Sequence, residues 1–320
     1  MTELPFDLNR IFHSKVMNFE ELAHQVYDFQ CKENATLKAF VSLAPPSTHY
    51  VFLPVDFFKT QQVICNGYKA EAIFTSSGTT GMEPSTHHVA SLAVYEESFL
   101  TAFRLFYGNP SDYCILALLP GYLERNNSSL VYMTQKLIEL SANPLSGFCL
   151  NDFEKLFDIL IQLKDKKVIL LGVTFALIDF AEKYAFHKPD LIIMETGGMK
   201  GRREEITRNE VHAALKNAFG VEHVHSEYGM TELLSQAYAM KDGRFFTPPW
   251  VKVIVTDAND PFTTLELGKT GIINVIDLAN IYSCSFIQTA DLGKLHIDGS
   301  FEVLGRLDNS DTRGCSLMYL

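Results

Sequence analysis

The sequence has no pair of cysteines at Cys-x-x-Cys spacing and no histidine cluster at the spacing of a metal site. A zinc site or a disulfide scaffold needs such regular spacing, so neither is expected. Scattered thiols are typical of a reducing compartment, and we expect a cytoplasmic protein. The cysteines are Cys31, Cys65, Cys114, Cys149, Cys284 and Cys315.

Long apolar runs and an excess of basic residues are also missing. The longest apolar run, residues 168–180, is interrupted by Gly172 and Asp179, and the N-terminus has no apolar core of signal-peptide length. We therefore expect no membrane span. The chain has 27 lysines and arginines against 38 acidic residues, a net charge of −11. This charge disfavours nucleic-acid binding, which needs a cationic patch, and favours a small-molecule or protein partner.

What the sequence does contain is an alternation of strand and helix patterns. Asn18 followed by Glu21 indicates the start of an amphipathic helix, and Thr207 with Glu210 forms a capping box that opens another, ending near residue 219. Between them, strands are predicted at 72–76, 114–120, 167–172 and 191–198, and helices at 88–106, 128–141, 152–163 and 173–186. This alternation predicts an α/β fold with a largely parallel sheet flanked by helices.

The pattern changes after residue 245. Short strand patterns then follow one another without an intervening helix, at 251–256, 271–277, 293–297 and 301–306. We therefore predict two domains, an α/β body over residues 1–245 and a smaller β-rich subdomain over residues 246–320.

A loop rich in hydroxyls and glycine, FTSSGTTGMEPS over residues 74–85, follows the first strand of the α/β pattern. Its backbone N–H groups and hydroxyls suit phosphate oxygens, because glycine allows close approach of the backbone and positive φ. It is not the GxxxxGK[ST] loop of nucleotide triphosphatases, since Met82 and Glu83 follow Gly81. By itself the loop is also compatible with an exposed turn.

Two further motifs follow in order, SEYGMTEL over residues 226–233 and ADLGKLHIDGSFEVLGRLD over residues 290–308. Together the three motifs, within residues 70–313, resemble the adenylate-forming superfamily of acyl-CoA synthetases, luciferases and peptide-synthetase adenylation domains. The chain is most similar there to the acyl-protein synthetase (LuxE) family, because its loop ends in Pro84-Ser85 where most relatives have Pro-Lys. The resemblance implies the superfamily's N-terminal domain without the C-terminal lid, and a ligase that uses ATP to convert a carboxylic acid to an acyl-AMP.

The resemblance assigns the phosphates and the metal to three segments. Thr231 would bind the α-phosphate and Glu232 would hold Mg²⁺, a hard cation that prefers oxygen ligands. Lys200 is one candidate for a cation facing the α-phosphate, because the loop and the absent lid supply no lysine; the alternative is an exposed lysine without a role. The β- and γ-phosphates would bind to Thr75, Ser76, Ser77, Gly78, Thr79, Thr80 and Gly81.

The resemblance also predicts which residues hold the nucleoside. Outside these motifs, the same residue types would be interpreted as a core ring, a turn or a surface charge. Tyr228 would stack on adenine beside Gly229. The backbone of Gly197 and Gly198 would lie against the same base. Asp291 would accept hydrogen bonds from the ribose hydroxyls, with Arg306 nearby.

Cys315 corresponds to the cysteine near the C-terminus that accepts the acyl group in the acyl-protein synthetases. A thiolate is the strongest side-chain nucleophile near neutral pH, and an acyl-AMP is a good electrophile. The resemblance implies a fatty or other apolar acid and transfer from Cys315 to an acyl reductase or another acceptor protein. Two alternatives stay open: an acyl-CoA ligase-type enzyme with a diffusible thiol, and a non-catalytic nucleotide-binding partner module.

The remaining cysteines and most of the histidines are expected to be structural. Buried cysteine commonly behaves as a small hydrophobic residue. No carboxylate or cysteine completes a ligand set around His87 and His88 or around His223 and His225. His225 could also line the pocket for the acid.

Overall fold

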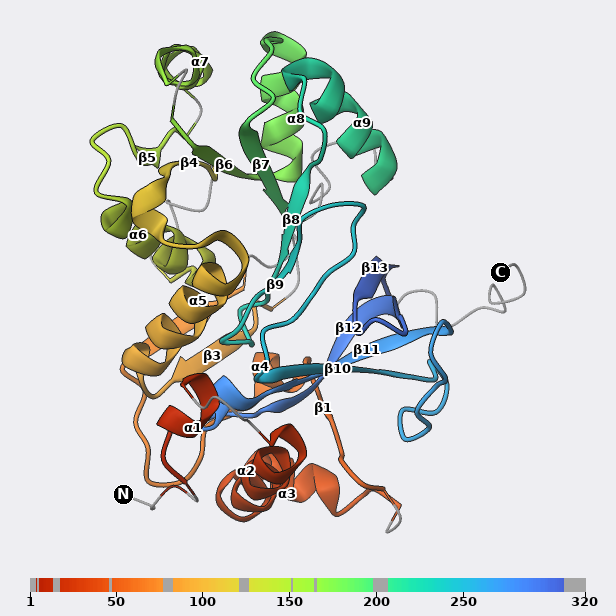
Figure 1. Ribbon diagram of the computed structural model, residues 1–320. Coiled ribbons are helices and arrows are strands. Elements are labelled where there is room, and N and C mark those ends of the chain that lie inside the picture. Colours follow the sequence, from red (N-terminus) through yellow and green to blue (C-terminus); the bar gives the residue numbers. More distant parts are fainter. Residues whose placement is uncertain are drawn as a thin grey trace. The chain divides into compact units, whose positions relative to one another are not determined.

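The computed structural model describes residues 4, 6–13, 18–45, 48–76, 83–120, 127–150, 152–163, 166–197 and 207–307 (Figure 1). The chain forms two compact units. One unit is Ala70–Pro248, and the other combines Met1–Lys69 with Pro249–Leu320.

The unit Ala70–Pro248 is built on a six-stranded sheet with the order β5-β4-β6-β7-β8-β9. All neighbours are parallel except β8 and β9, which are antiparallel. β4 and β6 are buried along their whole length, which explains their unbroken apolar sequences. The predicted α/β fold with a largely parallel sheet is confirmed. The strands are β4 (Cys114–Leu118), β5 (Gly147–Phe148), β6 (Val168–Val173), β7 (Leu191–Thr196), β8 (His225–Tyr228) and β9 (Ala237–Ala239).

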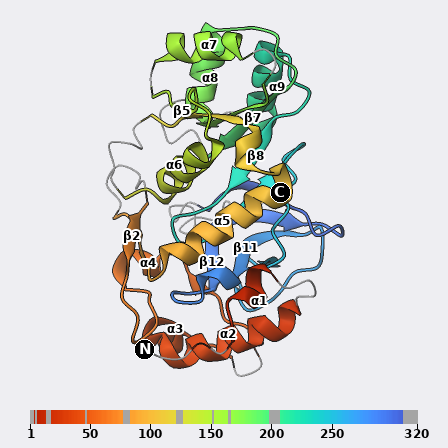
Figure 2. The ribbon, with the colours of Figure 1, turned by 60° about the vertical axis from the view of Figure 1, so that its left-hand side comes forward.

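Helices cover both faces of this sheet. α7, α8 and α9 share one face, where Phe180 of α8 packs on Phe153 of α7 and on Phe219 of α9. α5 and α6 lie beside each other, with Tyr95 stacked on Tyr132 (Figure 2). No helix in the described part of the chain is long and apolar enough to cross a membrane. The helices are α5 (Leu92–Tyr107), η1 (Pro110–Asp112), α6 (Ser129–Ser141), α7 (Phe153–Gln162), α8 (Thr174–Lys183) and α9 (Arg208–Phe219).

Local sequence explains where most of these helices begin. The side chains of Ser91, Ser128 and Asp152 each accept a hydrogen bond from the backbone N–H three residues later, at the starts of α5, α6 and α7. The predicted capping box is present at α9: the Thr207 hydroxyl accepts from the Glu210 N–H while the Glu210 carboxylate accepts from the Thr207 N–H.

The first predicted strand and helix of this unit need correction. β2 (Ala72–Thr75) does not join the parallel sheet but pairs antiparallel with β3 (Thr86–Val89) in a separate hairpin. The helix predicted at 88–106 begins only at Leu92, because residues 86–89 are extended in that hairpin and Ser91 supplies the cap. Helical periodicity does not reveal a short strand directly before a helix.

The other unit contains a five-stranded sheet, in which β1-β12-β11-β10 are neighbours and β13 also pairs with β12. The strand predicted at 293–297 is the second half of a longer strand, β12, whose first half pairs with β1 in parallel. The strands are β1 (Leu53–Pro54), β10 (Val251–Thr256), β11 (Thr270–Asp277), β12 (Phe286–Leu295) and β13 (Phe301–Arg306); the helices are α1 (Asn9–Phe12), α2 (Phe19–Glu33), α3 (Ala35–Val41), α4 (Phe57–Thr60) and η2 (Leu278–Asn280).

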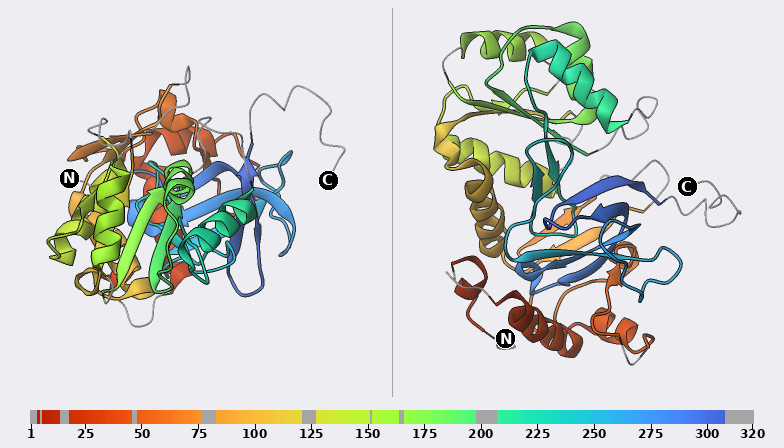
Figure 3. Two further views of the ribbon diagram at one scale, coloured as in Figure 1. Left: turned by 90° about the horizontal axis from the view of Figure 1, so that it is seen from above. Right: turned by 45° about the vertical axis from the view of Figure 1, so that its right-hand side comes forward.

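The N-terminal segment packs with the C-terminal strands, which differs from the expected grouping of residues 1–245. α2 and α3 lie along this sheet (Figure 3). The buried Gln30 side chain donates to the carbonyls of Asn280 at 3.0 Å and Ile281 at 2.9 Å, and Asn34 donates to the carbonyl of Ser283 at 2.8 Å. Such buried hydrogen bonds between distant segments leave no local trace in the sequence.

Candidate functional site

The β2–β3 hairpin closes the base of the predicted phosphate loop. The Ser76 N–H donates to the Ser85 carbonyl at 3.0 Å, and the Ser85 N–H donates to Ser76 Oγ at 2.8 Å. The Thr75 N–H donates to the carbonyl of Asn127 at 2.8 Å. Thr75, Ser76 and Ser85 are therefore fixed at the base of the loop, and we call these residues the neck of the loop. The other predicted loop residues, Ser77, Gly78, Thr79, Thr80 and Gly81, lie outside the described residues.

Ser85 is buried inside this neck. Both of its backbone hydrogen-bonding groups are used to hold Ser76. A serine fits this enclosed position because it carries no charge that would need solvent or a counterion.

Gly197, Tyr228 and Gly229 stand together at the carboxyl ends of β7 and β8. These strands are parallel neighbours with Thr196 opposite Glu227. The residues at their carboxyl ends therefore lie at the same edge of the sheet. Open α/β sheets bind ligands at this edge. Gly197 has φ +69°, and its carbonyl accepts a hydrogen bond from Thr174 Oγ1 at 2.6 Å.

Tyr228 is half-buried, and its ring packs edge-on against Phe245 with centroids 5.9 Å apart. A Cβ atom on Gly229 would lie 2.5 Å from Glu227 Oε1, so any larger residue would displace that carboxyl. The predicted adenine residues Gly197, Tyr228 and Gly229 thus share one edge. Gly198 and Lys200 lie outside the described residues.

Two buried glutamates lie at this edge, and the sequence motifs predicted no role for either. Each stands two residues before one of the glycines, in Glu195-Thr196-Gly197 and in Glu227-Tyr228-Gly229. A carboxylate within an otherwise apolar strand such as LIIMET is the signal that could have identified Glu195, because charged residues are rarely buried unless they are paired.

Glu195 is an ionised carboxylate held on the α8 and α9 side of the sheet. Ser226 Oγ donates to it at 2.7 Å, Thr174 Oγ1 lies 3.0 Å from Oε2, and Arg208 Nε lies 3.3 Å from Oε1. Burial opposes its ionisation, but His212, the Arg208 charge and Ser226 outweigh that effect and lower the pKa of Glu195. Its two oxygens therefore join α8, β8 and α9.

Glu227 has the opposite character. Burial raises its pKa to about 7, with a smaller contribution from the negative charge of Glu195, although a hydrogen bond donated by Thr196 Oγ1 acts in the other direction. The ionised groups and phenols around it are Glu195 on β7, Tyr95 and Tyr107 on α5 and Tyr238 on β9. Near neutral pH its carboxyl is partly protonated.

We expect Glu227→Gln to change how stability depends on pH. The folded pKa, about 7, lies above the ordinary value of 4.5, so the native state binds this proton more tightly. That stability is fully present below about pH 4.5 and is lost as pH rises through about 7. Glutamine stays neutral at every pH. As pH rises from about 4 to about 8, the unfolding free energy of the variant should therefore increase relative to that of the wild type by up to about 3 kcal/mol. Urea unfolding across that pH range measures these free energies. The same pH dependence of unfolding free energy in both proteins would contradict the prediction.

Thr231 and Glu232 form a turn directly after this edge. Glu232 is buried, and the Thr231 carbonyl lies 2.8 Å from Nδ1 of His87, on the β2–β3 hairpin. The hairpin that carries the predicted phosphate loop is thus connected to the turn that carries the predicted metal ligand.

Two further histidines, His225 and His88, are partly buried. His225 Nδ1 lies 3.1 Å from the Tyr107 hydroxyl. Burial, with a smaller effect of His223, lowers the pKa of His225 to about 4, so this ring is neutral near pH 7. Burial also lowers the pKa of His88.

Asp291 and Arg306 are brought together within the other compact unit. They are directly opposite each other on the antiparallel strands β12 and β13. The Asp291 N–H donates to Thr289 Oγ1 at 3.0 Å, and the Leu307 N–H donates to the carbonyl of Ala290 at 2.8 Å. Asp291 is half-buried and Arg306 is exposed. The predicted ribose pair therefore forms a cross-strand pair.

The cysteines of the described residues have raised thiol pKa values. Cys65, Cys114, Cys149 and Cys284 are buried and Cys31 is half-buried. Burial is the main cause in every case; it raises the pKa of Cys149 to about 11 and that of Cys284 to about 12. Cys315 lies outside the described residues.

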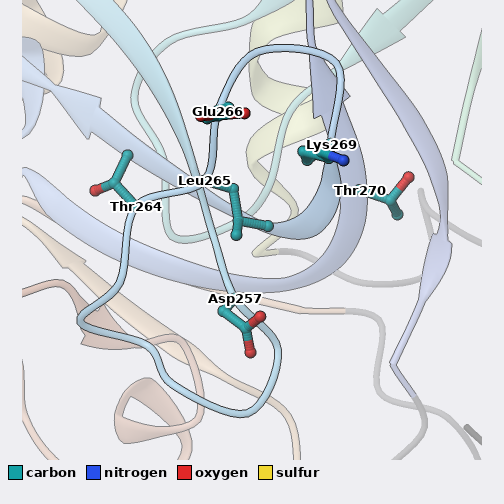
Figure 4. A pocket seen from close by; sticks show the side chains of 6 residues that line it. All are labelled: Asp257, Thr264, Leu265, Glu266, Lys269 and Thr270. Atoms are coloured by element: carbon teal, nitrogen blue, oxygen red, sulfur yellow. The ribbon is translucent and has the colours of Figure 1, made fainter.

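An open hollow is formed by the β10–β11 connection (Figure 4). Its side chains combine one lysine with two carboxylates, and none of the predicted site residues lines it. The lining residues are Asp257, Thr264, Leu265, Glu266, Lys269 and Thr270.

No protein-family model and no curated protein matches the chain. Solved structures do. MatB from Rhodopseudomonas palustris with ATP bound is 19% identical, with a TM-score of 0.56 over 73% of this chain and 48% of that one. O-succinylbenzoate coenzyme A synthetase (MenE) from Bacillus subtilis with AMP is 19% identical, with a TM-score of 0.51 over 75% and 49%. The chain thus spans about half the length of these two proteins.

A 2-hydroxyisobutyryl-CoA ligase, in an open conformation with 2-HIB-AMP and CoA, is 13% identical, with a TM-score of 0.64 over 94% of this chain and 72% of that one. The chain therefore has the fold of the adenylate-forming acyl-CoA synthetases. The comparisons do not single out acyl-protein synthetases within that fold.

Proposed function

We propose that this protein is an ATP-dependent ligase that activates a carboxylic acid as an acyl-AMP and then carries the acyl group on Cys315. The observation that supports it most is the shared carboxyl edge of β7 and β8, where Gly197, Tyr228 and Gly229 converge in a fold whose solved examples hold ATP, AMP or an acyl-adenylate. No single motif on its own supports that conclusion.

In the first step a carboxylate oxygen of the acid attacks the α-phosphorus, and the bond to the β-phosphate oxygen breaks to release pyrophosphate. Tyr228 would stack on adenine, Asp291 would accept from the ribose hydroxyls with Arg306 beside it, and Thr231 would donate to the α-phosphate. Lys200 is our candidate for the cation at that phosphate. The loop hydroxyls would orient the leaving phosphates, and positioning of this kind can supply much of the rate enhancement.

The residues at Glu232 fit a magnesium ion that arrives with ATP. Mg²⁺ is usually held by one or two carboxylates together with substrate phosphates and water. Among the described residues no group of three or more His, Cys, Asp or Glu could hold a metal ion alone, whereas the Glu232 carboxylate is a suitable single oxygen ligand beside Thr231. When bound, the ion would neutralise charge on the departing pyrophosphate.

In the second step the thiolate of Cys315 attacks the acyl carbonyl, a thioester forms and AMP leaves. The raised thiol pKa values of the five described cysteines support this assignment, because a thiol that stays protonated is a poor nucleophile. We propose a fatty or other apolar acid as the substrate, an acyl reductase or another protein as the final acceptor, and the cytoplasm as the compartment.

Isotope exchange between pyrophosphate and ATP tests the activation step. We expect exchange that depends on both a carboxylic acid and Mg²⁺, and a panel of acids of increasing chain length would identify the substrate class. ATP binding without acid-dependent exchange would contradict the ligase and favour a non-catalytic nucleotide-binding partner module.

A second candidate is an acyl-CoA ligase with a diffusible thiol. It is favoured by the neighbour that was solved with both 2-HIB-AMP and CoA. Intact-mass analysis after incubation with ATP, Mg²⁺ and a labelled acid separates the candidates: acyl-protein supports Cys315, whereas acyl-CoA formation without acyl-protein supports the diffusible thiol.

A further inference from the structure

His87 is a fully buried histidine with a specific polar contact. It lies on β3, where the buried His87 and Val89 alternate with the less buried Thr86 and His88. Burying an imidazole without hydrogen bonds is costly. Its position is therefore explained only if its ring nitrogens have partners.

The contact of Nδ1 determines where the proton lies. Nδ1 is 2.8 Å from the carbonyl oxygen of Thr231, and a backbone carbonyl can only accept a hydrogen bond. Nδ1 must therefore carry the proton and donate it. The carbonyl belongs to the peptide unit between Thr231 and Glu232, so this bond restrains the backbone that directs the Glu232 carboxylate.

The other side of the contact is rigidly connected to the neck of the predicted phosphate loop. His87 is opposite Phe74, and Thr86 is opposite Thr75, in the β2–β3 ladder. The reciprocal hydrogen bonds of Ser76 and Ser85 follow directly. A movement of the Thr231 carbonyl is thereby opposed by the same short hairpin that sets the base of the loop.

We propose that His87 is a positioning residue that keeps the Thr231–Glu232 turn in register with the phosphate-loop hairpin. This role rests on the proposed function, because it matters for catalysis only if Glu232 and the loop serve the same ATP. Most of the histidines were expected to be structural; for His87, the hydrogen bond to Thr231 adds a defined part in aligning the proposed metal ligand.

Three variants separate alignment from packing. His87→Asn places an amide N–H near the position of Nδ1, His87→Gln places it further out near Nε2, and His87→Phe fills the space without a donor. His88→Gln is the matched control, because His88 is the next residue and its Nδ1 has no hydrogen-bond partner. Thermal unfolding of all four establishes that they are folded.

We expect His87→Gln and His87→Phe to raise the Mg²⁺ concentration for half-maximal pyrophosphate exchange about fivefold, the size of one lost hydrogen bond. His87→Asn should stay close to the wild-type value, as should His88→Gln. Wild-type behaviour of His87→Phe, or equal loss in His87→Asn and His87→Phe, would overturn the proposal.

A measurement without catalysis distinguishes failure of this inference from failure of the proposed function. Nitrogen-15 NMR of labelled histidine, assigned by the signal that disappears in His87→Asn, should show the proton on Nδ1. The Nε2–H tautomer would overturn the inference even if exchange is observed. Absence of exchange in the wild-type protein would overturn the proposed function, and the catalytic role of His87 with it.

Discussion

Cys315→Ser is expected to abolish the hydroxylamine-labile acyl-protein that forms with ATP, Mg²⁺ and a labelled acid. A serine hydroxyl is almost entirely protonated near neutral pH, whereas a thiol is partly ionised and its anion is a strong nucleophile. Any ester that serine did form would resist hydroxylamine more than a thioester does. Intact-mass spectrometry before and after hydroxylamine treatment measures the result, and pyrophosphate exchange shows that the variant is folded.

Cys31→Ser is the matched control for this experiment. Cys31 is the least buried of the described cysteines, yet burial raises its pKa, and the hydrogen bond that it shares with Tyr27 does not reverse that effect. We expect its acyl-protein to equal that of the wild type. A labile acyl group that persists in Cys315→Ser would contradict the carrier role, and peptide mapping would then identify the residue that bears it.

Glu232→Gln is expected to lower acid-dependent pyrophosphate exchange by about 100- to 1000-fold. The substitution preserves the shape of a buried side chain but removes the charge that we propose binds Mg²⁺. Loss of electrostatic stabilisation by a bound metal costs several kcal/mol in the transition state, and each 1.4 kcal/mol is about tenfold in rate. Exchange measured as a function of Mg²⁺ concentration tests it, and excess Mg²⁺ should restore part of the rate.

The control for the lost charge is Glu222→Gln, in the same compact unit. The Glu222 side chain is 89% exposed, and its Oε1 lies 3.4 Å from Nε2 of His223. We expect wild-type exchange from this variant. Equal exchange in Glu232→Gln and Glu222→Gln would remove Glu232 from the proposed metal site.

Much of the secondary structure was predictable from local signals. The capping box at Thr207 and Glu210 and the strands at 251–256 and 301–306 appear where the sequence predicted them. The β2–β3 hairpin and the parallel pairing of β1 with β12 were not predicted. Periodicity and caps depend on neighbouring residues, whereas strand pairing between residues 53 and 287 depends on tertiary packing.

The candidate site shows the same division. The three motifs predicted roles for Tyr228, Glu232 and Asp291 from contiguous residues, and those roles stay predictions. The connection of His87 to Thr231 and the different ionisation of Glu195 and Glu227 required the structure. Whether a buried carboxyl keeps its proton depends on the partners that surround it, and those partners come from several elements.

The sequence by itself determined the alternating α/β pattern, the order of the three motifs and the type of chemistry that they predict, because each is written in contiguous residues. Only the tertiary structure decided which strands lie beside each other, which side of the sheet each glutamate faces and which thiols are buried. Those properties arise from packing between distant segments, for which single-residue patterns carry no signal.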